Sequence, residues 1–299
     1  MSRHFSHRPI SYLSLLSLLA LVGCRQTTQQ TRTRNSNRSV TTRSTPSYRP
    51  TQAAGTGSSS NEGNLLLGNP SNAGRDNNNY LLEKPQYSLS YNKKNGGPNW
   101  VAWHTDASDL GDTDRGKFRP DSALPAAWRI SPNDYKNSGY DRGHVCPSGD
   151  RTNSRDNNDA TFYMSNMLPQ TGELNRHVWS NLENYIREQI RAGNEVYQIA
   201  GPAGTASTIA DGQIVVPRLC WKVAVIIPEG KGDWSRITAQ SRVIAVAMPN
   251  TDDKKLETAD WRTYLVSPRK IEDLTRLNFF NKLSPKVKSA LEQKVDSGE

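Results

Sequence analysis

Apolar side chains recur at the spacing of an α-helix over residues 175–192. They lie three or four positions apart, so they would share one face of the helix. Gly193 follows the last of them, and glycine is a common residue just beyond the end of a helix. The pattern therefore predicts one long amphipathic helix here. Its apolar face consists of Val178, Leu182, Tyr185, Ile186 and Ile190.

Runs rich in β-branched and aromatic residues predict strands elsewhere in the chain. Pro202, Pro228 and Pro249 stand at or just beyond the ends of three of these runs, where proline is tolerated. Residues 105–125 read as a loop, ordered structure begins near Asn64, and one or two further helices are expected in 268–295. Strands that are separate from helices indicate an α+β domain over 63–299, with a central antiparallel sheet flanked by helices. The expected strands are 100–104, 195–200, 214–227 and 237–248.

The first residues have the composition of an export signal. Arg3 and Arg8 precede an apolar stretch over 10–22, which is shorter than a membrane-spanning helix. The stretch ends in Leu-Val-Gly-Cys, which resembles a bacterial lipobox with Cys24 as the lipidated residue. Residues 1–24 are therefore expected to be a lipoprotein-type signal peptide, and the alternative is an ordinary cleaved signal with an incidental cysteine. Either signal exports the protein, with a membrane anchor at the cell envelope (periplasm or outer membrane) in the first case and secretion in the second.

Charge is distributed unevenly along the chain. The net charge is +9, but residues 1–60 hold eight arginines and no acidic residue. Residues 61–299 are left with 30 basic and 29 acidic side chains, so the folded part is not broadly basic. An anionic ligand would have to be bound by a local cluster of cations. Residues 25–62 are polar and arginine-rich with few apolar side chains, which predicts a disordered tether.

Two cysteines, Cys146 and Cys220, remain in the folded part once Cys24 is set aside. An even number of cysteines in an exported domain is compatible with a disulfide. Two buried free thiols are equally compatible with the sequence, so both alternatives stay open.

The residues with catalytic chemistry are concentrated between 139 and 187. His144 is suited to accept a proton from water near neutral pH, and Asn175 offers a neutral oxygen of the kind that binds hydrated Mg²⁺. Glu183 lies about two helical turns beyond Asn175, and Arg187 follows one turn later. The combination indicates an anionic substrate that completes the coordination of the metal. Such a substrate would use all four groups: the base, the metal ligand, the carboxylate and the guanidinium.

The order of these residues resembles the DNA/RNA non-specific endonuclease family, which has a ββα-metal finger and includes mitochondrial endonuclease G and secreted bacterial nucleases. The resemblance is carried by Asp-Arg-Gly-His at 141–144, Asn-Met-Leu-Pro-Gln at 166–170, and the stretch from Asn175 to Glu183. It implies that His144 is the general base and Asn175 the direct protein ligand of Mg²⁺, for which Mn²⁺ would substitute. Glu183 would orient the waters of that ion.

The resemblance also assigns phosphate contacts. It places Arg142 and Arg187 near the phosphate and Gln170 in a supporting polar position, and either Arg115 or Arg119 supplies a further arginine, with Arg115 preferred. The implied activity is cleavage of DNA and RNA with little sequence preference, leaving 5′-phosphate ends.

Three neighbouring residues are given structural or peripheral roles. His177 is expected to face outward from the helix, Trp179 to lie in the core, and Cys146 to pack or to pair with Cys220. Two rival functions stand beside the enzyme: a non-catalytic surface protein that captures DNA through the arginine-rich tether, and a nuclease toxin.

Overall fold

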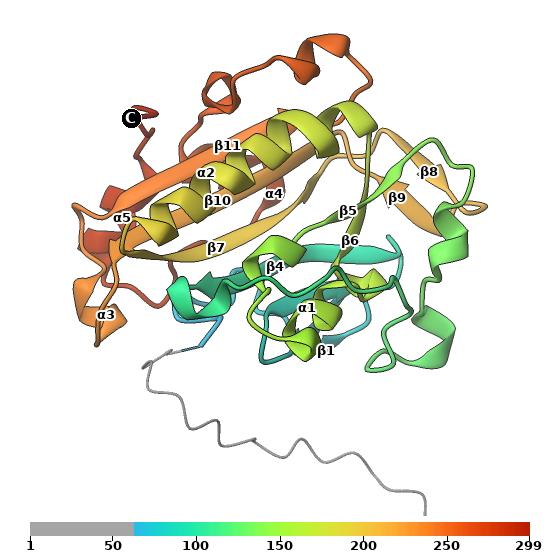
Figure 1. The fold of residues 1–299 in the computed structure, drawn as a ribbon, viewed down its shortest axis with the longest axis horizontal. Helices are drawn as coiled ribbons and strands as arrows, with labels where there is room; N and C mark the ends of the chain where they lie inside the picture. Colours follow the sequence, from blue (N-terminus) through green and yellow to red (C-terminus); the bar gives the residue numbers. More distant parts are fainter. Residues whose placement is uncertain (1–62) are drawn as a thin grey trace, which may run out of the picture. The chain divides into compact units, whose positions relative to one another are not determined.

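A seven-stranded antiparallel sheet forms the centre of the computed structural model, which describes residues 63–299 (Figure 1). The strand order is β1-β2-β3-β4-β7-β10-β11, and two separate hairpins pair β5 with β6 and β8 with β9. The predicted signal and tether lie outside the described residues. The strands are β1 (Arg75–Asp76), β2 (Asn79–Glu83), β3 (Ser88–Asn92), β4 (Gly97–Thr105), β5 (Asp141–His144), β6 (Met167–Gln170), β7 (Asn194–Ala203), β8 (Ser207–Ile209), β9 (Ile214–Val216), β10 (Leu219–Pro228) and β11 (Arg242–Pro249).

Helices cover both faces of this sheet, and several of them have a side-chain cap at their first turn. Ser154, Ser267 and Ser284 each accept a hydrogen bond from a backbone N–H of the helix that follows. The α-helices are α1 (Arg155–Thr161), α2 (Trp179–Arg191), α3 (Asp233–Arg236), α4 (Pro268–Thr275) and α5 (Pro285–Glu292). A π-helical turn, Leu174–Val178, leads directly into α2.

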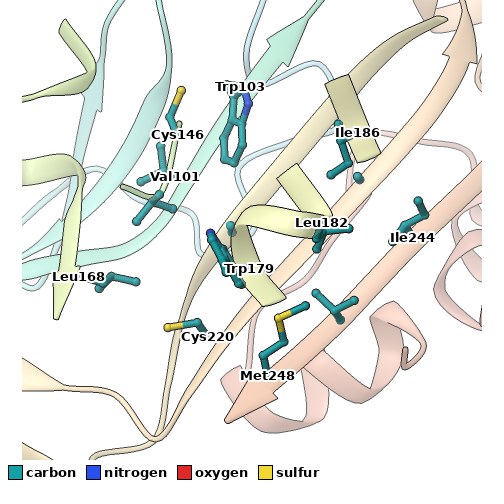
Figure 2. Packing of buried hydrophobic residues seen from close by; sticks show 14 of the residues in the cluster. Val101, Trp103, Cys146, Leu168, Trp179, Leu182, Ile186, Cys220, Ile244 and Met248 are labelled. Atoms are coloured by element: carbon teal, nitrogen blue, oxygen red, sulfur yellow. The ribbon is translucent and has the colours of Figure 1, made fainter. Parts of the chain in front are cut away.

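The longest helix, α2, lies along β7, β10 and β11 (Figure 1). Its apolar face buries Trp179, Leu182, Ile186 and Ile190 against alternate residues of the sheet (Figure 2). Successive strand residues face opposite sides of a sheet, so the remaining residues of β10, such as Trp221 and Val223, pack on the other side. There they meet α4, α5 and the Phe279–Phe280 pair. The sheet is therefore apolar on both faces.

The β5–β6 hairpin and α2 together form a ββα unit at the edge of the molecule's main core. β5 pairs with β6 from Asp141↔Gln170 to His144↔Met167. The chain then passes through the π-helical turn into α2. The expected α+β fold with a central antiparallel sheet flanked by helices is confirmed, and the hairpin followed by a helix matches the expected ββα arrangement.

Three predicted strand boundaries are wrong. The run 214–227 is not one strand, because Pro217 separates β9 from β10. The run 237–248 begins later, at Arg242, since Ile237 instead ends α3 and is buried below the sheet. Pro202 lies inside β7 rather than beyond its end. It is tolerated there because β4 pairs with β7 only as far as Ala200, so at Pro202 the strand has a partner on the β10 side alone.

Cys146 and Cys220 are both buried and both free in the structure. Both belong to the core beneath α2 (Figure 2). Burial raises the pKa of both thiols, that of Cys220 to about 12. Of the two alternatives that the sequence leaves open, the structure shows two buried thiols.

Candidate active site

A polar cavity of about 460 Å³ opens where β5 meets the first turns of α2. All the site residues expected from the sequence line it: His144, Asn175, Glu183, Arg142, Arg187 and Arg115. Asp141, Ser148, Gly149, Ser180, Phe118, Tyr140 and Pro147 complete the wall. Residues that are up to 72 positions apart in sequence are thus brought to one cavity by the ββα unit and the loop before it.

Gly143 on β5 leaves space for the side chain of Gln170 on the paired strand β6. A Cβ atom built on Gly143 would lie 1.9 Å from Oε1 of Gln170, which is far inside contact distance. The side chain of Gln170, itself 1% exposed, fills the space that any other residue would need. Glycine is therefore needed next to His144 because a larger residue would displace Gln170. An unusual backbone angle is not the reason.

His144 reaches the cavity at the end of β5, with its ring set among aromatic side chains. The ring centroid lies 4.7 Å from that of Phe162 and 5.5 Å from that of Phe118. Its Nε2 is buried and has no hydrogen-bond partner among the described residues. Burial lowers the pKa of His144 to about 3, and the nearby charge of Arg115 acts in the same direction. The imidazole is therefore neutral at pH 7.

Asn175 is oriented by a carboxylate on the facing strand. Its Nδ2 donates to Oδ2 of Asp141 at 3.0 Å, and no described residue donates to its Oδ1. Arg176 binds the same carboxylate through Nε at 2.8 Å and Nη2 at 2.6 Å. Burial acts to raise the pKa of Asp141, but the hydrogen bonds from Arg176 and Asn175 hold it below its ordinary value. The ionised Asp141 thus orients the amide of Asn175. The amide oxygen, Oδ1, is left free to bind an ion.

The π-helical turn sets the register between Asn175 and Glu183. The N–H of Trp179 donates to the carbonyl of Leu174, the i→i+5 bond that defines such a turn. This turn takes up about one residue more than an α turn, so the eight positions from Asn175 to Glu183 complete about two turns. In an uninterrupted α-helix the two side chains would be roughly 80° apart around the axis. The wider turn brings both onto the face that lines the cavity.

Glu183 is a half-buried carboxylate that pairs with a cation from the sheet. Nζ of Lys222 lies 3.6 Å from its Oε1. Lys222 is 1% exposed, lies between the rings of Trp103 and Trp179 at 5.1 and 5.0 Å, and has no hydrogen-bond partner among the described residues. Burial raises the pKa of Glu183, while Lys222 and then Arg187 counteract this. The ammonium beneath the cavity therefore favours the ionised form of the carboxylate.

Arg187 is held in place by Asp150, on the short segment after β5. Its Nη1 donates to Oδ1 of Asp150 at 2.9 Å, and its Nη2 donates to Asn184 at 2.7 Å. A Cβ on Gly149 would lie 2.9 Å from Nη1 of Arg187, so the glycine gives the guanidinium its space. Burial acts to raise the pKa of Asp150, but the charges of Arg187 and Lys222 hold it below its ordinary value. Asp150 is thus the ionised group that anchors this side of the cavity.

Two further arginines reach the cavity from its other walls. Arg142 donates to the carbonyl of Pro132 through Nε and Nη2, and its guanidinium lies 5.3 Å from the Phe118 ring. Arg115 lies over Phe162 at 5.4 Å. Arg119, the alternative to Arg115, instead lies 3.7 Å from Asp159 and stacks on Tyr163. Of these two arginines, only Arg115 lines the cavity.

Three residues named from the sequence lie outside the cavity wall. Gln170 is buried behind Gly143 and does not line the cavity. The side chain of His177 is 39% exposed, and its Nε2 lies 3.8 Å from Glu173, away from the lining residues. Trp179 is 2% exposed and belongs to the core.

Two residues of this arrangement have no role in the sequence interpretation. Asp150 follows the Asp-Arg-Gly-His motif by six residues, but only the fold shows that it binds Arg187. Lys222 carried a visible signal, because it is a single charged residue inside an otherwise apolar strand. A charge in such a strand is costly to bury unless it has a partner, and its partner is Glu183.

The donor set fits a hard divalent cation together with an anionic substrate. The free Oδ1 of Asn175 is a neutral oxygen ligand, and Glu183 supplies a carboxylate on the same face. The lining residues include three arginines and two carboxylates, so the cavity is suited to a phosphate group. With a neutral base beside them, these groups have the composition needed to cleave a phosphodiester.

Comparisons with known proteins agree with this geometry. Residues 67–286 match the model of a family described as DNA/RNA non-specific endonuclease. A protein named Nuclease from Nostoc sp. (strain PCC 7120 / SAG 25.82 / UTEX 2576) is 47% identical over 238 residues, which cover 78% of this chain and 86% of that protein. Nuclease C1 from Cunninghamella echinulata var. echinulata is 32% identical over 244 residues, covering 76% of this chain and 90% of the relative.

One further relative and one solved structure also match. Mitochondrial endonuclease G from Homo sapiens is 37% identical over 139 residues, covering 46% of this chain and 47% of that protein. A solved structure of an EndoG/EndoGI complex aligns with a TM-score of 0.62 and 27% identity, over 74% of this chain and 91% of that one.

Proposed function

The chain belongs to the DNA/RNA non-specific endonuclease family and is a hydrolase that acts as an endonuclease, and from this premise we propose that it cleaves with His144 as general base and Asn175 as ligand of Mg²⁺. The observation that carries the proposal is that His144 and Asn175 line one cavity. The imidazole of His144 is neutral, and Oδ1 of Asn175 is left free by the bond from Nδ2 to Asp141.

The chemistry follows from the protonation states of the residues. Neutral His144 accepts the proton of the attacking water. Glu183 lies beside Lys222 and offers carboxyl oxygens that accept hydrogen bonds from water in the cavity. A divalent cation bound at Asn175 would supply a Lewis acid for the phosphate oxygens. Mg²⁺ is the proposed ion, with Mn²⁺ as a substitute, because the set is all oxygen and includes no thiolate.

Arginines bind the rest of the phosphate. Arg115, Arg142 and Arg187 present guanidinium groups to the cavity from three different parts of the chain. They stabilise the charge that develops on the phosphate as the bond breaks. Contacts of this kind read the backbone and not the bases, which supports cleavage of DNA and RNA alike with little sequence preference. The proposed products carry 5′-phosphate ends.

Digestion assays test the activity. The full chain is incubated with plasmid, single-stranded DNA and RNA, in Mg²⁺, in Mn²⁺ and in EDTA. Cleavage of all three substrates is expected with either ion, and none is expected in EDTA. End-labelling of the products before and after phosphatase treatment identifies the 5′-phosphate. Binding of DNA with no cleavage under any of these conditions would favour the rival surface protein that only captures DNA.

The location is a further part of the proposal. Lipidation of Cys24, after export directed by residues 1–24, would anchor the enzyme at the cell envelope. None of the helices within residues 63–299 is long and apolar enough to cross a membrane. Replacing Cys24→Ser should release the protein from the membrane fraction or stop its processing. A mature mass and a membrane fraction that are both unchanged would contradict the lipid anchor and leave ordinary secretion.

A further inference from the structure

A second group of metal-binding side chains lies at the end of β4, outside the catalytic cavity. His104, Asp106 and Asp109 each contribute one ligand atom, and these three atoms lie within 4.8 Å of one another. The side chain of His104 is 1% exposed and that of Asp109 is 20% exposed, while Asp106 is 5% exposed as a whole residue. None of the three lines the catalytic cavity. Two of the three residues are buried and Asp109 is half-buried, unlike the exposed acidic clusters common on protein surfaces.

The ring of His104 has one nitrogen occupied and one free. Nε2 lies 2.9 Å from Oε2 of Glu195, whereas Nδ1 is buried with no hydrogen-bond partner among the described residues. Histidines that bind metals commonly donate their other N–H to a carboxylate, which fixes the tautomer and the ring. Since Glu195 occupies Nε2, Nδ1 is the nitrogen that remains for a further ligand.

The charges around His104 leave an excess of acid. Glu195 and Asp233 share one cation, Arg236, which binds both of them. On the other side, Arg151 pairs with Asp109 at 3.2 Å. Asp106 accepts hydrogen bonds from the N–H and hydroxyl of Ser108 and from the backbone N–H of Asp109, all of which are neutral donors. Two arginines thus face four carboxyl groups in a largely buried region, so acidic side chains outnumber basic ones around His104.

Distances among the three ligand atoms suit a cation better than direct hydrogen bonds. The ligands of a transition metal stand about 2.0–2.2 Å from the ion, so they are roughly 3–4 Å from one another. Nδ1 of His104 has no hydrogen-bond partner among the described residues, and each of the three residues has a ligand atom within 4.8 Å of those of the other two. A small contraction around an ion would complete the coordination. An imidazole with two carboxylates is a donor set for Mn²⁺ or Zn²⁺.

We propose that His104, Asp106 and Asp109 bind a second divalent cation, separate from the ion at Asn175, and that this ion is structural. Asp109 ends the short helical turn Ala107–Asp109, and the chain continues from there to Arg115 in the cavity. Arg151 pairs with Asp109 and donates to the carbonyl of His104, and its neighbour Asp150 binds Arg187. The ion would therefore brace the start of the segment that carries Arg115.

Counting bound Mn²⁺ by electron paramagnetic resonance tests the site without using activity. The full-length wild-type chain should bind two ions, and Asn175→Ala should bind one. Asp109→Asn should also bind one, since the amide keeps the hydrogen bond from the N–H of Asp106 but removes the charge. Asp112→Asn is the matched control: Asp112 is an exposed residue on the same segment, and this variant should still bind two.

A second measurement identifies the ligand. In the Asn175→Ala variant, the remaining Mn²⁺ should show spin-echo modulation from an imidazole nitrogen, and it should raise the melting temperature. Both signals should disappear when His104→Gln or Asp109→Asn is added. One ion in the wild type with none in Asn175→Ala would overturn the proposal. Two ions in a folded Asp109→Asn variant, or no imidazole modulation, would also overturn it.

Discussion

The amide of Asn175 donates to the carboxylate of Asp141 at 3.0 Å, so Asp141 orients the residue whose oxygen stays free in the cavity. Replacing Asp141→Ala should therefore raise the Mg²⁺ concentration needed for cleavage by ~10–100-fold, the usual cost of losing such a supporting partner. Arg176→Gln is the matched control, because Arg176 binds the same carboxylate from an exposed position. It should shift the Mg²⁺ titration much less. Equal shifts in both variants would show that the ion pair, and not the amide bond, is what matters.

His144 and Asn175 should give different signatures when removed. His144→Ala deletes only the proposed base, so turnover should fall by ~10²–10⁴-fold with little change in Mg²⁺ requirement, and added imidazole should restore part of it. Asn175→Ala deletes the proposed metal ligand, so the Mg²⁺ requirement should rise and imidazole should not help. Mg²⁺ titrations of cleavage distinguish the two variants. If His144→Ala were the one to lose metal affinity, His144 would be a ligand.

The depressed pKa of His144 makes the fold sensitive to acid. An unfolded histidine binds its proton near pH 6.5, whereas in the folded chain the pKa is about 3. Between these values the unfolded state holds more protons, so this group's contribution is complete above pH 6.5 and is lost as the pH falls. The loss approaches about 1.4 kcal/mol per pH unit in that window. Urea unfolding from pH 7 to pH 4 should show a shallower decline for His144→Gln than for the wild type. Parallel curves would mean that His144 is protonated in the folded state.

Lys222 should control the protonation of Glu183. Lys222→Met removes the cation 3.6 Å from the carboxylate, so the pKa of Glu183 should rise further and cleavage at neutral pH should fall. Activity should recover in part at higher pH, a change of profile that simple loss of packing would not produce. Lys270→Met, an exposed residue of α4, is the control.

The same pair can be followed by stability. An unpaired buried charge commonly costs about 3–5 kcal/mol, so Lys222→Met should lower the free energy of unfolding. Adding Glu183→Gln removes the stranded carboxylate and should recover some of that loss. A double variant less stable than either single variant would contradict the pairing.

The thiols of the two core cysteines should react slowly in the folded protein. In a chain with Cys24→Ser, a thiol reagent should modify Cys146 and Cys220 slowly while the protein is folded, because both are buried with raised pKa values. Two thiols should titrate at once after unfolding without a reductant. A titre of zero under those conditions would reveal a disulfide.

Local patterns in the sequence predicted most of the core fold. The apolar face from Val178 to Ile190 marks the helix because burial against a sheet demands that spacing. The strand run through Pro217 misled because the residues on both sides are equally apolar, and only the chain's departure into the β8–β9 hairpin separates them. Patterns of this kind report burial. They do not report which hydrogen bond a backbone makes, so the π-helical turn at Leu174–Val178 was not predicted.

Some residues of the candidate site could be predicted from the sequence, and others could be identified only from the structure. His144, Asn175 and Glu183 were found because the resemblance spans a short stretch of chain. Lys222 comes from β10, and its distance to Glu183 depends on how α2 packs over the sheet. A sequence does not reveal long-range packing of this kind. The one sign of it here is a single charged residue within an apolar strand. Arg115 and Arg119 were separated only by the structure, which pairs Arg119 with Asp159 and places Arg115 at the cavity.

The wide turn before α2 also bears on how relatives of this site are found. An extra residue in one turn keeps Asn175 and Glu183 aligned at a spacing of eight. A regular α-helix aligns two side chains at about seven positions, since two of its turns hold ~7.2 residues. A chain that lacked this one residue could thus keep the same two groups facing the same cavity. Motif searches that fix the interval would miss such a chain, and an alignment gap at this point would mark a difference in helix geometry with no loss of the site.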